Sequence, residues 1–224
     1  MFLALLRKEY FKIAWWWYAL LCCNALLMGY VFMETRRLFI LDHAEIVWYR
    51  VLYLDQIHYA PMRFIPLFSG LLLGFAQFLP EMNAERMRLS LHLPLSSYLV
   101  MLGHLCVGLL AVLLTLCLDF GLLVLITARY FPWEAVCNAT QTFLPWAGAG
   151  VSAYLGSALV LLEPSFRLRV CNLALSAGAC GFFLRQAAPG GYVPALFFLG
   201  LVLALMLPAV LLPAYRFRFR RVDV

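Results

Sequence analysis

Two side chains that can exchange a proton lie inside one long apolar stretch of this sequence, His104 and Asp119. A charge within the hydrocarbon of a bilayer costs free energy, so both are candidates for a polar site or for the catalytic groups of an intramembrane enzyme. Fifteen residues of helix separate them by about 22 Å, so they cannot form one pair. The structural alternative is that Asp119 hydrogen-bonds a neighbouring helix and His104 lies near the membrane interface. An enzyme would need a second ionisable group at matching depth, and the other apolar stretches offer none.

A short charged segment, 81–94, separates two apolar stretches and carries Glu81, Glu85, Arg86 and Arg88. One interpretation is a solvated loop with charge pairs four residues apart. The other is a docking helix for a soluble partner. Tilting a short rigid helix wedged between two spans must move both spans, so such a helix would transmit motion into the membrane.

Motifs of catalysis and of nucleotide binding are absent: the chain has no GxxxxGK[ST], no HExxH and no GxSxG. Its seven cysteines are scattered, without the spacing of a metal site or a disulfide framework. We therefore expect no catalytic residue, no cofactor and no metal in this chain. Gly70 and Gly74 match the GxxxG pattern of helix packing, which also arises often by chance.

Composition indicates the class of protein. The 224 residues are 65% hydrophobic and 12% charged, with a mean hydropathy of +0.90, whereas a soluble domain carries roughly 25% charged residues. Apolar runs of about 20 residues cross a bilayer as helices, while a β-barrel would alternate polar and apolar residues. We predict an all-α polytopic membrane protein. The net charge of +6 fits basic residues at lipid headgroups better than nucleic-acid binding, so no nucleic-acid partner is expected.

The entry segment, 1–13, predicts an amphipathic helix along the membrane surface, with Leu3, Leu6, Tyr10 and Ile13 opposite its charged residues. A cleaved signal peptide is the alternative, but the next apolar run has full membrane length and no small-residue cleavage site follows. The aromatic cluster 15–18 suits the headgroup region.

The single transmembrane domain 1–224 then comprises an interfacial helix at 1–13, spans near 14–33, 64–80, 95–127, 142–162, 170–184 and 192–214, an outer loop at 34–61 and a cytoplasmic segment at 81–94.

The distribution of Lys and Arg predicts the orientation, because these residues gather on the cytoplasmic side. With both termini inside, eleven lie on the cytoplasmic side and six on the outer side. The inner set is Arg7, Lys8, Lys12, Arg86, Arg88, Arg167, Arg169, Arg216, Arg218, Arg220 and Arg221, and the outer set is Arg36, Arg37, Arg50, Arg63, Arg129 and Arg185.

This layout resembles the permease subunit of type-2 ABC transporters, a mostly exporting family. The resemblance rests on a basic entry helix, here Leu5-Leu6-Arg7-Lys8-Glu9, and on six spans with both ends inside. Between the second and third spans such permeases carry a coupling segment with an acidic residue and a Pro-hydroxyl step, here Leu93-Pro94-Leu95-Ser96. The match covers most of the chain in topology and about 40 residues in sequence.

The resemblance implies the membrane-spanning permease subunit of an ATP-driven exporter in a bacterial inner membrane, dimeric with a second permease copy or homologue. ATP and Mg would be bound by a separately encoded ATP-binding subunit, which would push on Glu81, Glu85, Arg86 and Arg88. The alternative is a non-transporting anchor or assembly subunit of a larger membrane complex, with 34–61 as its partner surface. The sequence does not indicate the transported substrate.

Overall fold

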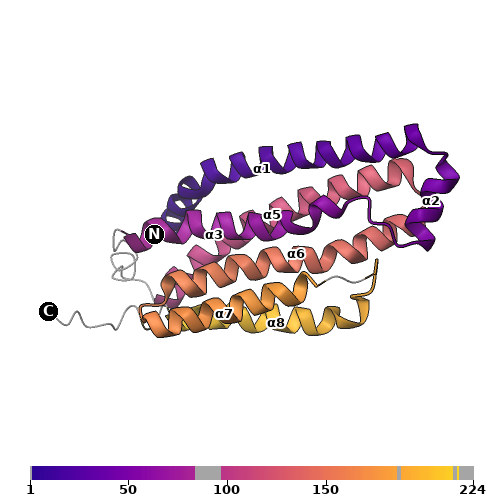
Figure 1. Ribbon diagram of the computed structural model, residues 1–224. Helices are drawn as coiled ribbons and strands as arrows, with labels where there is room; N and C mark the ends of the chain where they lie inside the picture. Colours follow the sequence, from indigo (N-terminus) through magenta and orange to yellow (C-terminus); the bar gives the residue numbers. More distant parts are fainter. Residues whose placement is uncertain (1, 84–96, 186–187, 214–215, 217–224) are drawn as a thin grey trace.

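The protein is a bundle of long helices that run up and down beside one another (Figure 1). The computed structural model describes residues 2–83, 97–185, 188–213 and 216, and within these ranges it contains no strand. Backbone groups in lipid must be paired within the element itself, which favours helices. The elements are α1 (Phe2–Leu41), α2 (Ala44–Tyr53), the 3-10 helix η1 (Ala60–Phe64), α3 (Ile65–Asn83), α5 (Ser97–Tyr130), α6 (Trp133–Leu162), α7 (Phe166–Phe183), the 3-10 helix η2 (Val193–Ala195) and α8 (Leu196–Ala209).

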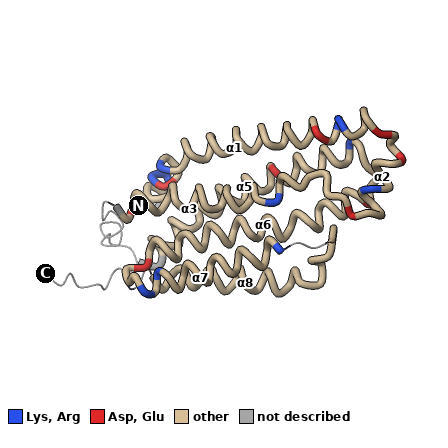
Figure 2. Tube along the Cα trace, viewed as in Figure 1, with Lys and Arg blue, Asp and Glu red and all other residues tan. Residues whose placement is uncertain are grey.

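The bundle has two distinct ends. Helix α1 begins and α8 ends at one of them, which we call the N-terminal end, and α2 lies at the other, the α2 end (Figure 1). Asn83 and Ser97, which flank the charged segment, both lie at the N-terminal end, opposite the 34–61 region. Lys, Arg, Asp and Glu gather mainly at the two ends (Figure 2). Helix α1 therefore begins and α8 ends at the same end of the bundle, while the placement of both termini in the cytoplasm stays a prediction.

Five of the described helical stretches are long and apolar enough to cross a membrane, which is consistent with an integral membrane protein. They contain or closely overlap five of the six predicted spans. The remaining predicted span, 170–184, corresponds to α7, which runs alongside the others but begins with Arg167 and Arg169 and is less apolar. The crossing of the membrane by α7 stays a prediction.

Helix α1 is one continuous helix of 40 residues, where the sequence predicts an interfacial helix followed by a span. No glycine or proline occurs before Gly29 to interrupt it. Of the predicted apolar face, Leu3 is 79% exposed and Ile13 is buried, whereas Glu9, assigned to the charged face, is fully buried. The buried side contains Leu5, Glu9 and Ile13, because α3 and α5 pack against it.

The centre of the bundle is the contact between α3 and α6. A Cβ atom placed on Gly70 would lie 1.9 Å from the carbonyl oxygen of Gly150, and one on Gly74 would lie 1.7 Å from the hydroxyl oxygen of Ser157. The two backbones can approach this closely only because these positions lack side chains. The GxxxG pattern is thus confirmed as a packing surface, and its partner is α6.

At the α2 end, an aromatic cluster joins the loop before α3 to the end of α5. The ring of His58 stacks on Phe131 at a centroid distance of 4.4 Å and meets Tyr59 edge-on at 4.9 Å. Neither ring nitrogen of His58 has a hydrogen-bond partner among the described residues. Burial disfavours the imidazolium form and lowers the pKa of His58 from 6.5 to about 4.

Because the pKa of His58 is lowered in the folded protein, we expect the protein to lose stability in acid. Between pH 6.5 and pH 4 the unfolded chain binds a proton at His58 and the folded chain does not, so the free energy of unfolding falls as the pH drops. We expect His58→Phe, which can still stack on Phe131, to reduce this fall by on the order of 2 kcal/mol. Thermal unfolding of both proteins in detergent from pH 7 to pH 4 measures it. Parallel pH profiles of the two proteins would contradict the assignment.

Candidate functional site

Three helices bring three ionisable side chains together near the N-terminal end. Glu9 comes from α1, Glu81 from the last turns of α3 and His104 from the first turns of α5, and none is more than 1% exposed. Charged residues buried this deeply require partners, because removing a charge from water is costly. We call this group, with the lysines described next, the Glu9 cluster.

Two lysines of α1 neutralise the carboxylates. Lys12 Nζ lies 2.6 Å from Glu9 Oε2 and 3.0 Å from Glu81 Oε1. Lys8 Nζ lies 3.2 Å from the same oxygen of Glu81 and 3.9 Å from Glu9 Oε1. One turn of helix separates Glu9 from Lys12, so both project toward α3. The two ammonium groups and two carboxylates balance, and they join α1 to the end of α3.

His104 completes the cluster from α5. Its Nδ1 lies 2.8 Å from the carbonyl oxygen of Val100, which only accepts, so Nδ1 carries the hydrogen. Its Nε2 then faces Glu9 Oε1 at 3.3 Å. Neither His104 Nε2 nor Glu9 Oε1 has a hydrogen-bond partner among the described residues, so their contact brings α5 to the cluster without a hydrogen bond between them.

A hydrogen-bond chain extends the cluster to α6. Gln77 of α3 donates through Nε2 to Glu9 Oε2 at 3.1 Å and to the backbone oxygen of His104 at 2.7 Å. Tyr154 of α6 donates to Gln77 Oε1 at 2.7 Å. A Cβ atom on Gly108 would lie within 2.1 Å of both the Gln77 and Tyr154 side-chain oxygens. The network thus spans four helices, and glycine at position 108 leaves room for it.

The cluster also has the donor atoms of a metal site. One ligand atom from each of Glu9, Glu81 and His104 lies within 4.8 Å of the others, and Zn²⁺ accepts both carboxylate and imidazole ligands. The ammonium group of Lys12 already bridges the two carboxylates. Because their charge is balanced, we assign the cluster as an ion-pair network.

Of the predicted coupling residues, the structure places Glu81 in this cluster, while Glu85, Arg86 and Arg88 lie outside the described residues. His104 was predicted as an isolated polar group, and the structure gives it the ionisable neighbour Glu9 that sequence reasoning did not find. Sequence reasoning also missed the roles of Lys12, Gln77 and Tyr154. A carboxylate three residues before a lysine, ahead of an apolar run, was the available signal.

Asp119 lies in a second, separate polar group. Asn24 of α1 donates through Nδ2 to Asp119 Oδ2 at 2.9 Å and to Ser69 Oγ of α3 at 3.2 Å. Asp119 is 2% exposed, and the three side chains come from three helices in the middle of the bundle. The prediction that Asp119 and His104 form no pair is confirmed, since each contacts a different set of residues.

No family model matches this chain, and neither a curated protein nor a solved structure gives a match.

Proposed function

We propose that this chain is the membrane-spanning permease subunit of an ATP-driven exporter, acting as a dimer with a separate ATP-binding subunit. The observation that carries the proposal is the ion-pair contact of Lys8 and Lys12 with Glu81. Glu81 lies in the last turn of α3 and is the first residue of the predicted coupling segment 81–94. The entry helix and the coupling segment are therefore joined at one point.

A partner that displaces this contact would move three helices at once. The 81–94 segment connects α3 to α5, so displacing it moves the ends of both. Because Glu81 also holds Lys12, α1 must follow, and the hydrogen bond from Gln77 to Glu9 ties the same movement to the interior. A rigid network with two alternative arrangements is the kind of element through which a nucleotide-driven partner can switch a membrane domain.

Coexpression with the product of a neighbouring reading frame that carries a Walker motif tests the proposal. We expect that product to copurify in mild detergent and to hydrolyse ATP at a rate set by this chain. Glu81→Gln, which keeps the side-chain shape, should change that rate at least tenfold because it removes the charge that holds Lys12. Glu34→Gln is the matched control, since Glu34 forms an exposed pair with Arg37 at the α2 end.

Two outcomes would refute the exporter assignment. The first is a preparation in which no ATP-binding protein accompanies the chain, which would favour the anchor or assembly role. The second is a complex in which Glu81→Gln elutes as a single folded species and hydrolyses ATP as the unaltered complex does. Such a complex would show that the ion pairs of Glu81 do not couple this chain to ATP hydrolysis.

A further inference from the structure

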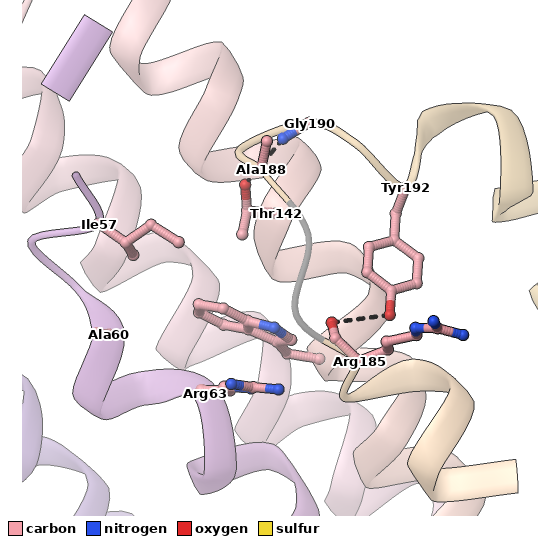
Figure 3. A pocket seen from close by; sticks show the side chains of 9 residues that line it. Ile57, Ala60, Arg63, Thr142, Arg185, Ala188, Gly190 and Tyr192 are labelled. Atoms are coloured by element: carbon pink, nitrogen blue, oxygen red, sulfur yellow. Dashed lines mark hydrogen bonds between the residues drawn. The ribbon is translucent and has the colours of Figure 1, made fainter. Parts of the chain in front are cut away.

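A cavity of about 400 Å³ opens between η1, α6 and the α7–α8 connection, toward the α2 end (Figure 3). We call it the basic cavity because arginines from two segments line it and no carboxylate of the described residues does. The polar side chains on its walls are Arg63, Thr142, Trp146, Arg185 and Tyr192. The hydroxyl groups of Thr142 and Tyr192 donate to backbone oxygens, so the guanidinium groups of Arg63 and Arg185 are the charged donors that the cavity offers to a ligand.

The arginines of this cavity have no acidic partner. Within the described ranges, neither Arg63 nor Arg185 lies within 4 Å of a carboxylate, whereas exposed Arg37 and Arg50 do form such pairs. Arg63 donates to the backbone oxygen of Leu184. Two uncompensated positive charges beside one cavity favour an anion.

Two apolar hollows adjoin the basic cavity. One of about 500 Å³ lies between α7 and α8, shares Arg185 and Tyr192 with the cavity, and continues to Phe198 and Val202. The other, of about 460 Å³, runs along α3, α6 and α7 and includes Leu184, whose carbonyl oxygen accepts from Arg63. We call them the α7–α8 groove and the α3–α6–α7 groove. Apolar atoms form most of the lining of both.

We propose that the basic cavity and these grooves form one binding site for a membrane lipid with an anionic headgroup. The phosphate would accept from Arg63 and Arg185, and the acyl chains would lie in the two grooves. This arrangement of a donor-lined head site continuous with apolar channels matches the two chemistries of such a lipid. A free phosphate would satisfy the arginines and leave both grooves without an occupant.

The test uses the purified chain alone, so it is independent of any ATP-binding partner. The chain is placed in detergent micelles with phosphatidylglycerol or with phosphatidylcholine of the same acyl chains, and bound lipid is counted by native mass spectrometry. We expect phosphatidylglycerol to bind at least tenfold more tightly. The double variant Arg63→Gln/Arg185→Gln should lose this preference. The control Arg36→Gln/Arg129→Gln, which removes the same charge from exposed sites, should keep it.

A second variant addresses the grooves without altering charge. A Cβ atom on Gly181, which lines the α3–α6–α7 groove, would meet no atom within 4 Å, so Gly181→Leu should fold and fill part of the groove. We expect it to weaken phosphatidylglycerol binding several-fold. Equal binding of the two lipids, or unchanged binding by both variants, would overturn the proposal. Inorganic phosphate that displaces phosphatidylglycerol at millimolar concentration would reassign the site to a soluble anion.

Discussion

Replacing Gly70 with alanine is expected to destabilise the bundle by about 3 kcal/mol or more. The added Cβ atom would lie 1.9 Å from the carbonyl oxygen and 2.8 Å from the carbonyl carbon of Gly150. Both are backbone atoms, so no side chain can rotate away and α3 must separate from α6. Overpacking in a well-packed core usually costs 1–3 kcal/mol, and here the loss extends along the most closely packed helix pair.

The chain supplies matched controls for this prediction. Gly121 has open space around its Cβ position, so Gly121→Ala should leave the melting temperature nearly unchanged. Gly74→Ala should fall between the two, because the atom that it meets first is the hydroxyl of Ser157, which can rotate. Thermal unfolding in one detergent ranks the three variants. If Gly70→Ala melts at the same temperature as Gly121→Ala, the close contact of α3 with α6 is wrong.

Replacing Lys12 with methionine should cost a comparable amount, about 3–5 kcal/mol. Methionine keeps much of the side-chain length but removes the ammonium group that contacts Glu9 and Glu81 at 2.6 and 3.0 Å. Breaking a buried ion pair by removing one partner leaves an uncompensated buried charge. The free energy of unfolding in micelles measures the loss.

A double-mutant cycle separates this charge effect from lost packing. Adding Glu9→Gln to Lys12→Met should recover part of the stability, because the carboxylate left without its partner is then neutral. Arg37→Met is the control, since its partner Glu34 lies 3.8 Å away on the exposed surface and such pairs contribute 0–1 kcal/mol. Strictly additive effects of the two Glu9-cluster substitutions would show that the ion pair is not coupled.

The all-helical class and the positions of most helices could be predicted from the sequence, because the lengths of the apolar stretches determine both. The predicted span 64–80 lies within α3 and its 3-10 extension, and the predicted outer loop 34–61 contains the end of α1 and the short helix α2. The break before α6 coincides with Pro132, which precedes its first residue. Each of these features depends on the residues of one segment alone, so it can be predicted without knowing which other segments pack against it.

The Glu9 cluster could not be predicted in the same way, because its members come from three helices. The periodicity of residues 1–13 indicated a charged face but not that α3 and α5 cover Glu9. Gln77 is an ordinary polar residue within a span until Tyr154 is placed beside it. Likewise, GxxxG identified one half of the α3–α6 contact, whereas Gly150 belongs to no such motif and was missed.

Helix α1 is about 60 Å long, twice the thickness of the hydrocarbon layer, and nothing in its first 27 residues can act as a joint. In the proposed exporter, α1 would act as a lever between the two faces of the membrane. Near its start, α1 is held by the ion pair of Lys12 with Glu81. Near its end, it is connected through α2 to the aromatic cluster at Phe131. In that role, a rotation imposed beside Glu81 would appear as a displacement at the α2 end, without a chemical signal passing between the two.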